Sequence, residues 1–210
     1  MVVRLTEIDE LLREQHYWLG KRDVCYFLRE YTPGVGFGGS KTNSLISNLK
    51  KRLNASKGEL YYKQQAIQQV ARELTAVLRG DDWEGTVFVP MPPSVHRDEP
   101  EYDDRLVKVL RRVGRAIRAE VRELLVTTRS YPAVSRSAVR LSPSELLDLM
   151  EVDEDQAEPA PERVVVFDDV ITAGAHFVAA RKILEQRFPG VEVEGLFVAR
   201  TMHEEGRAEH

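Results

Sequence analysis

The sequence predicts an α/β protein in which a parallel sheet is flanked by helices. Apolar runs of strand length alternate with amphipathic helical patterns, and two of these runs, 86–89 and 164–167, are continuously apolar. Continuously apolar strands are typical of parallel sheets buried on both faces, and alternation with helices favours crossover connections. The chain of 210 residues accommodates one such domain with a small additional region.

The individual elements follow from the spacing of apolar residues. Helical spacing predicts helices over 5–12, 43–53, 61–79, 103–122 and 175–188. Short apolar runs predict strands over 25–28, 86–89, 124–127, 164–167 and 191–199. The glycine-rich stretch 32–40 is expected to be a plain loop, because it lacks the Gly-Lys-Ser/Thr ending of a phosphate-binding Walker loop. The stretch 153–161 is interpreted as a solvated linker, since eight acids and no base lie between 145 and 162.

Composition excludes several classes of protein. The 30 basic and 34 acidic side chains give a net charge of −4, so the whole chain has no strong attraction to nucleic acid or anionic membrane. Cys25 is the one cysteine, which excludes an intrachain disulfide and a cysteine-based zinc cluster and fits a reducing compartment. The N-terminus lacks the apolar core of a signal peptide, and no apolar run approaches the roughly 20 residues of a membrane span. We therefore expect a soluble, cytoplasmic protein without membrane contact.

One predicted helix, 103–122, has a strongly basic face. Its members are Arg105, Lys108, Arg111, Arg112, Arg115, Arg118 and Arg122. A solvated helix face is the usual reason for such a pattern, and contact with DNA or RNA is the alternative. Few aromatic residues are interleaved with these charges, which favours the solvated face.

The segment 164–176 carries the clearest chemical pattern. A buried strand delivers Asp168 and Asp169 to its carboxyl end, and the small residues of 172–175 lead directly into a helix. Ligands of parallel α/β sheets bind at such strand ends, and backbone N–H groups at a helix N-terminus attract anions. Neighbouring carboxylates accept hydrogen bonds from sugar hydroxyls and attract Mg²⁺. The pattern favours a phosphorylated sugar with a metal ion, and an acidic strand end that merely caps the helix is the alternative.

This segment resembles the 5-phosphoribosyl-1-diphosphate (PRPP) binding motif of the type I phosphoribosyltransferases. Four apolar residues, two acids, two apolar residues and then Thr-small-Gly match the pattern of that family. Two positions depart from it. His176 stands where the family usually has Thr or Ser, whose hydroxyl holds the 5′-phosphate, and Ala173 replaces the commoner Thr or Ser. The departures put retention of binding or catalysis in question.

Other segments resemble the ComF, or competence-associated, branch of the family. They are 87–92 at the pyrophosphate-binding loop, 125–133 at the mobile loop, 196–200 at the last strand and 45–50 at the helix ahead of the core. The N-terminal zinc ribbon of many ComF proteins is absent, since Cys25 stands alone. The Arg-Gly-Phe-Asn-Gln segment of the branch is also missing.

The resemblance implies transfer of a 5-phosphoribosyl group to an acceptor with release of pyrophosphate and participation of Mg²⁺. It places the ribose hydroxyls, and Mg²⁺ directly or through water, at Asp168 and Asp169. It places the 5′-phosphate at Thr172, Ala173, Gly174, Ala175 and His176. It places pyrophosphate at Met91, Pro92, Ser94 and Arg97, with His96 nearby, and puts Arg129, Arg136 and Arg140 on the mobile loop. A phosphate bound beside His176 is expected to raise the pKa of its imidazole.

The resemblance also implies a domain organisation. Residues 1–60 would form a small helical, hood-like region over the acceptor, and 61–210 the phosphoribosyltransferase-like core, with 128–162 holding the mobile loop and the acidic linker. The acceptor is expected to be a small molecule, with a nucleobase as the common choice of the family, and homodimers are frequent in it. A non-catalytic PRPP- or nucleotide-binding regulator and a component of DNA uptake or processing are the alternatives on the same fold.

Overall fold

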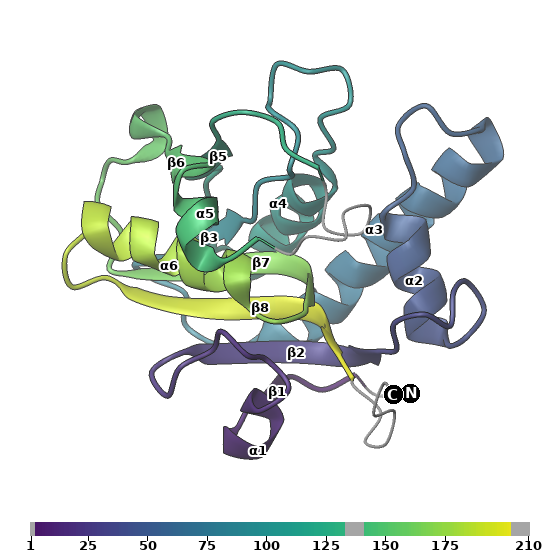
Figure 1. Cartoon of the computed structure of the whole chain (residues 1–210), viewed down its shortest axis with the longest axis horizontal. Coiled ribbons are helices and arrows are strands. Elements are labelled where there is room, and N and C mark those ends of the chain that lie inside the picture. The colour runs from purple at the N-terminus through teal and green to yellow at the C-terminus, as the bar shows by residue number, and fades with distance from the viewer. Residues whose placement is uncertain (1–2, 133–140, 203–210) are drawn as a thin grey trace.

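The computed structural model describes residues 3–132 and 141–202, and a mainly parallel sheet lies at its centre (Figure 1). Within these residues the sheet has six strands in the order β1 (Thr6–Glu7), β2 (Val24–Tyr31), β8 (Glu192–Thr201), β7 (Arg163–Ile171), β3 (Thr86–Pro90) and β4 (Glu120–Val121). Each neighbouring pair is parallel except β1 and β2. The predicted class, a parallel sheet flanked by helices, is confirmed.

Strand β7 is central, and its burial follows from its sequence. Val164, Val165, Val166 and Phe167 pair on one side with β3 and on the other with β8, and each is at most 5% exposed. Because the neighbouring strands are parallel to β7, its carboxyl end opens at the same edge of the sheet as theirs. This is the edge at which Asp168 and Asp169 lie.

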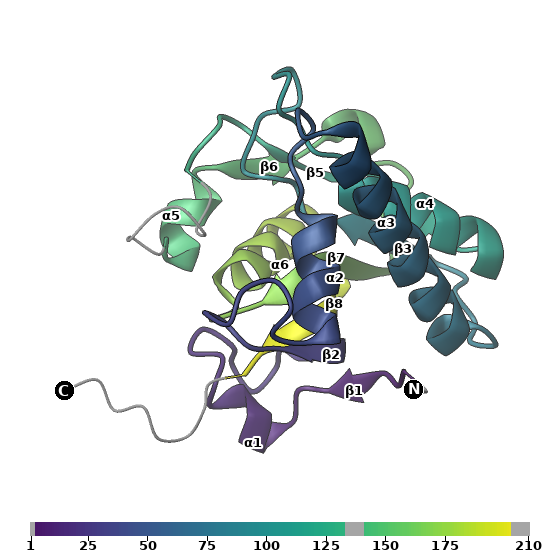
Figure 2. The same cartoon turned by 90° about the vertical axis from the view of Figure 1, so that its right-hand side faces the viewer.

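Helices cover both faces of the sheet. Figure 2 shows α6 (Ala175–Arg187) on one side and α3 (Lys57–Leu78) and α4 (Arg105–Ile117) on the other. The helix α2 (Lys41–Leu49) begins at Ser40, whose side chain caps the N–H of Asn43, and packs against α3 and β2. These helices agree in place with the predicted ones, with ends shifted by a few residues.

The predicted strand over 124–127 exists but lies outside the central sheet, which corrects the sequence-based topology. Strand β5 (Leu125–Thr127) pairs with β6 (Met150–Val152) in a separate two-stranded sheet beside α5 (Pro143–Leu147). The central sheet instead takes β4. The reason is that α4 ends early, with Arg118 in the left-handed region at φ 59°, and the reversed chain runs back alongside β3.

The acidic stretch 153–161 is also more ordered than a solvated linker. A short 3-10 helix, η2 (Glu154–Gln156), begins it, and Ala157 is fully buried. The guanidinium of Arg122 donates to the carbonyls of Gln156 and Pro159, at 3.3 and 2.6 Å. Backbone carbonyls bound to a buried cation tie this stretch to the core despite its composition.

The N-terminal residues contribute to the same sheet. The helix predicted over 5–12 is replaced by β1 and the one-turn helix α1 (Glu10–Arg13), because Asp9 caps the N–H of Leu12 and starts the helix late. The region predicted over 1–60 supplies β2, which pairs with β8 of the predicted core along seven residue pairs. The predicted division into a hood and a core stays a prediction. Among residues 3–132 and 141–202, each helix is too short or too polar to cross a bilayer.

Candidate functional site

The two acids at the end of β7 have different surroundings. Asp169 is 3% exposed, and its Oδ1 lies 2.8 Å from Lys50 Nζ at the end of α2. Its Oδ2 lies 2.7 Å from Nη2 of Arg105 at the start of α4. Asp168 is half-buried and accepts the backbone N–H of Asp169 at 2.7 Å. The charge of Asp169 is therefore neutralised by two cations from different helices, whereas the charge of Asp168 has no such cation beside it among the described residues.

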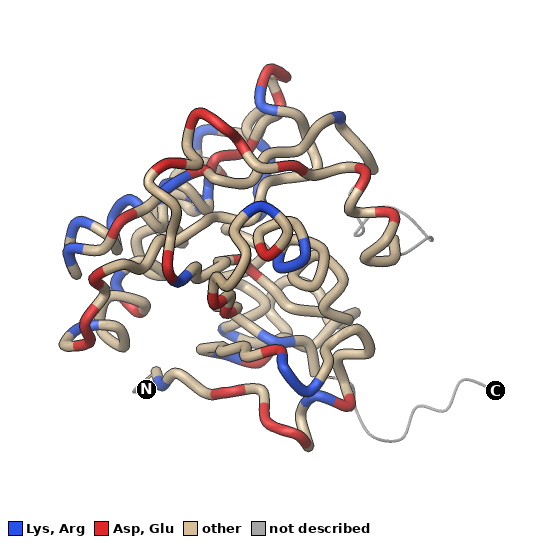
Figure 3. The backbone as a smooth tube through the Cα atoms, turned by 90° about the vertical axis from the view of Figure 1, so that its left-hand side faces the viewer, with Lys and Arg blue, Asp and Glu red and all other residues tan. Residues whose placement is uncertain are grey.

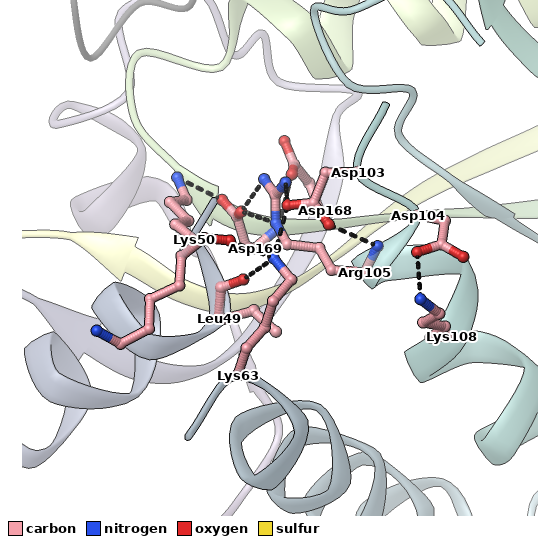
Figure 4. Close-up of polar contacts among 10 residues, drawn as sticks. Leu49, Lys50, Lys63, Asp103, Asp104, Arg105, Lys108, Asp168 and Asp169 are labelled. Carbon is pink, nitrogen blue, oxygen red and sulfur yellow. Dashed lines mark hydrogen bonds and ion pairs between the residues drawn. The ribbon is translucent and has the colours of Figure 1, made fainter. Parts of the chain in front are cut away.

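The ion pairs of Asp169 belong to a larger network (Figure 4). Asp103 Oδ2 lies 3.0 Å from Arg105 Nη1 and 2.7 Å from Lys63 Nζ. The Lys63 ammonium, nearly fully buried on α3, also donates to the carbonyls of Leu49 and Lys51 at the end of α2. The network thus fixes α2, α3 and α4 against the carboxyl end of β7.

Burial and charge shift the pKa values of the two acids in opposite directions. Burial alone would raise the pKa of Asp169, but Lys50 and Arg105 outweigh it and hold that pKa well below its usual value. Burial, and then the charge of Asp169, raise the pKa of Asp168 to about 7. Near neutral pH, Asp168 is therefore protonated in part of the molecules.

The turn after β7 leads directly into α6. Gly174 is the N-cap of α6 with φ 89°, and no side chain caps the helix. The N–H groups of Ala175, His176 and Phe177 have no acceptor within the helix, as at every helix start. A Cβ on Gly174 would come within 2.9 Å of the Leu19 side chain, so the chain approaches closely here. Uncapped N–H groups at a helix start attract anions in general.

The N-terminal region holds this turn from the other side. The backbone N–H of Trp18 donates to the Ala173 carbonyl at 2.8 Å, and His16 Nδ1 contacts the Thr172 carbonyl. These contacts engage carbonyl groups only. They fix the turn and do not involve the N–H groups at the start of α6.

His176, where the chain departs from the family pattern, contacts Tyr131. The Tyr131 hydroxyl lies 3.4 Å from Nε2 of His176, and the two rings are stacked. Burial, and then the charge of Lys50, lower the pKa of His176 to about 4. The imidazole is therefore neutral at pH 7 without ligand, and a bound phosphate would have to raise this pKa by about three units to charge it.

The candidate pyrophosphate loop packs against the start of the candidate mobile loop. The Met91 N–H donates to the Phe167 carbonyl at 2.8 Å, and Pro92 has no N–H, so neither offers a free backbone donor here. The Ser94 carbonyl accepts the N–H of Tyr131. Arg97 lies 2.8 Å from Asp153 and points to the acidic stretch. The pyrophosphate assignment stays a prediction.

The mobile-loop arginines are only partly within the described structure. Arg129 is exposed, and no ion pair links it to any residue that the structure describes. Arg136 and Arg140 lie outside the described residues. Their predicted role at the pyrophosphate stays a prediction.

The basic face predicted on 103–122 does not form as one surface. Arg105 points into the site, and Arg122 is buried against Glu120. Lys108 and Arg111 pair with Asp104 and Glu123. Both signs of charge are interspersed along the chain in Figure 3. This arrangement takes Arg105 and Arg122 out of the predicted basic face and leaves Arg112, Arg115 and Arg118 exposed on it.

Sequence reasoning missed the cations that complete the site. Lys50 lies in the segment 45–50, to which no charge role was assigned, Lys63 carries no motif, and Arg105 was assigned to a solvent-facing stripe. A usable signal existed in Lys63, which lies at helical spacing with the apolar residues Ala66, Ile67 and Val70 of the buried face of α3. A lysine on an apolar face requires a buried acceptor, which Asp103 supplies.

The fit of a magnesium ion can be judged from the donors. Within the described residues, no cluster of three or more metal-ligating side chains occurs. Both oxygens of Asp169 are taken by cations, whereas Asp168 has no ion pair within those residues. One free carboxylate fits a magnesium ion that is carried largely by substrate oxygens and water.

Comparisons with known proteins assign no family by sequence. No family model matches the chain, and no curated protein matches it. Among solved structures, the fold is similar to adenine phosphoribosyltransferase from Trypanosoma brucei, crystallised with AMP, pyrophosphate and ribose-5-phosphate. The TM-score is 0.43 and the identity 10%, over 86% of each chain. These values are too low to assign an activity, and the ComF branch expected from the sequence gains no support.

Proposed function

We propose that the chain is a PRPP-binding, phosphoribosyltransferase-like protein that transfers a 5-phosphoribosyl group to an unidentified small-molecule acceptor. The observation that carries the proposal is the distance along the chain between two features. Asp168 and Asp169 lie within the last four residues of the central strand, which ends at Ile171, and only the turn 172–174 separates that strand from the uncapped start of α6. A ribose 5-phosphate has its hydroxyls and its phosphate at the matching ends.

In this proposal the chain supplies binding and orientation. The N–H groups of Ala175, His176 and Phe177 hold the 5′-phosphate, and the carboxylates accept the ribose hydroxyls. An acceptor nitrogen forms the new bond to C1 as the bond from C1 to pyrophosphate breaks. Pyrophosphate leaves with the electron pair, and the acceptor nitrogen loses a proton to solvent. Positioning of this kind lowers barriers without a covalent intermediate.

The charges of the site fit an anionic ligand. Lys50, Lys63 and Arg105 are opposed by Asp103 and Asp169, while Asp168 is partly protonated near pH 7. The inner network therefore carries a net charge of +1 when Asp168 holds its proton and no net charge when Asp168 is ionised. A magnesium ion bound with the substrate would supply charge neutralisation at the pyrophosphate and favour loss of that proton.

The second candidate is a non-catalytic binder of PRPP or a nucleotide. It is favoured by the two cations on Asp169, since this acid would have to exchange an ion pair for a ribose hydroxyl. The backbone engagement of Met91 also favours it, because the pyrophosphate loop offers fewer donors. A component of DNA uptake gains nothing from the interrupted basic face.

Calorimetric titration with PRPP, with and without Mg²⁺, tests the proposal. We expect wild type to bind and Asp168→Asn to bind at least about tenfold more weakly, because the metal-attracting carboxylate is lost. Asp81→Asn, at an exposed turn far along the chain from the site, is the control and should bind as wild type does. Equal affinity of all three proteins would overturn the proposal. Pyrophosphate release with a panel of nucleobases then separates a transferase from a binder.

A further inference from the structure

A groove lies between α3 and α4, away from the site described above. Its volume is about 690 Å³. The lining residues are Ala71, Arg72, Thr75, Ala76, Arg79 and Gln68 from α3 and its end, and Arg112 and Ala116 from α4. The start of α3 and the start of α4 belong to the candidate site, whereas these residues lie on the later turns of both helices.

Small side chains make the groove and arginines surround it. Ala71 is buried at the floor, while Ala76 and Ala116 are exposed and leave room for another backbone to approach. Arg72, Arg79 and Arg112 are all exposed. Within the described part of the chain, none of the three forms an ion pair, although Arg112 donates to the Lys108 carbonyl.

Unpaired arginines around an apolar floor are complementary to a ligand that is acidic on its flanks and apolar along its centre. We propose that this groove binds an acidic amphipathic helix of a partner protein. In helix-in-groove binding, an amphipathic helix lays its apolar face into a groove of this kind. Arg72 and Arg79 are two turns apart, or about 10 Å along α3, and a helix with glutamates seven residues apart repeats that spacing.

A nucleic acid fits the groove less well. The lining residues present no aromatic ring on which a base would stack, and the floor is alanine. The net charge of −4 gives the chain no general attraction for a polyanion. An acidic amphipathic helix would contact both the arginines and the apolar floor of the groove, whereas a phosphate backbone would contact the arginines alone.

The test uses a labelled synthetic helix of about 18 residues, long enough to follow the groove. It carries glutamates seven residues apart beside a Leu/Ala stripe, and its partner peptide has lysines in place of the glutamates. Fluorescence anisotropy measures binding to wild type, to Arg72→Glu/Arg79→Glu and to the control Lys21→Glu/Lys182→Glu. The control reverses two exposed charges elsewhere, and far-UV circular dichroism verifies that each variant is folded.

We expect the acidic peptide to bind wild type and the control equally and to weaken with salt. It should bind the arginine variant at least about tenfold more weakly, and the lysine peptide should recover binding to that variant. Ala76→Trp, which fills the groove without changing charge, should also weaken binding. No binding of the acidic peptide, equal binding to the arginine variant, or tighter binding of a single-stranded oligonucleotide would each overturn the proposal. Asp168→Asn should bind the peptide normally, so this result is independent of PRPP.

Discussion

Replacement of the two neighbouring acids at the end of β7 should have opposite consequences for stability. Asp169→Asn removes the charge that compensates Arg105, whose side chain is 17% exposed. Loss of one partner of a buried ion pair costs about 3–5 kcal/mol. Arg105 keeps Asp103 at 3.0 Å, and an Asn oxygen still accepts a hydrogen bond, so the lower end, about 3 kcal/mol, applies. Lys50 is 43% exposed and adds less than about 1 kcal/mol.

Asp168→Asn should be nearly neutral or stabilising by up to about 1 kcal/mol at pH 7.5, because it removes repulsion with Asp169. Urea unfolding of wild type and both variants measures the difference. At about 3 kcal/mol, Asp169→Asn should also lower the melting temperature by about 6–12 °C. If the free energies of unfolding of the two variants differ by less than about 1 kcal/mol, the two acids do not have the different surroundings described above.

The dependence on pH gives a second readout of the same pair. The folded-state pKa of Asp168, about 7, lies above its ordinary value of 3.8. Its contribution to stability is therefore fully present below pH 3.8 and is lost as the pH rises through 7. Asp168→Asn should remove this decline, so its stability should fall less than that of wild type from pH 4 to 7.5. Parallel curves would contradict the raised pKa.

Three further results are expected. Gly174→Ala should destabilise the protein more than Gly190→Ala does. Both glycines have φ near 90°, but only at Gly174 would a Cβ meet Leu19. Urea unfolding compares the two variants, and equal losses of unfolding free energy would refute the close contact. Lys50→Ala should lower the free energy of unfolding by less than about 1 kcal/mol, since exposed ion pairs contribute little. A loss above about 2 kcal/mol in the same assay would show that the ion pair between Lys50 and Asp169 behaves as a buried one. NMR titration should find His176 neutral at pH 7 with ribose-5-phosphate bound, because charging it from a pKa of about 4 requires about 4 kcal/mol; an imidazolium there would contradict this.

The sequence predicted the parts of the fold that depend on local patterns. The start of the central strand, the turn after it and the start of α6 were placed correctly, because apolar runs and small residues act locally. The strand predicted over 164–167 was too short, since β7 continues through Asp168 and Asp169 to Ile171. The position of the strand over 124–127 was not predicted correctly, because it depends on where α4 ends. That end is set by Arg118 in a left-handed conformation, which the pattern of apolar residues does not reveal. The acidic stretch was misjudged because its order comes from a distant cation, Arg122.

Among the charged side chains of the candidate site, the sequence predicted the acids and left a usable signal for Lys63. Which acid would be neutralised depended on Lys50 and Arg105, which approach Asp169 from helices 119 and 64 residues away along the chain. Helical spacing placed Arg105 on the basic face of the helix predicted over 103–122. In the structure Arg105 is the first residue of α4, and its side chain points toward Asp169 at the edge of the sheet. Charge compensation between distant elements leaves no periodic signal in the sequence.

The most direct test of the account follows the backbone amides of the α6 start. Ribose-5-phosphate titrated into ¹⁵N-labelled protein should shift the N–H resonances of Gly174, Ala175, His176 and Phe177 downfield, because phosphate oxygens accept hydrogen bonds from them. The shifts should weaken in Gly174→Ala, and amides of the α3–α4 groove should stay unchanged. Saturating ribose-5-phosphate that leaves the four resonances in place, or shifts only amides elsewhere, would contradict the claim that this helix start holds a sugar phosphate.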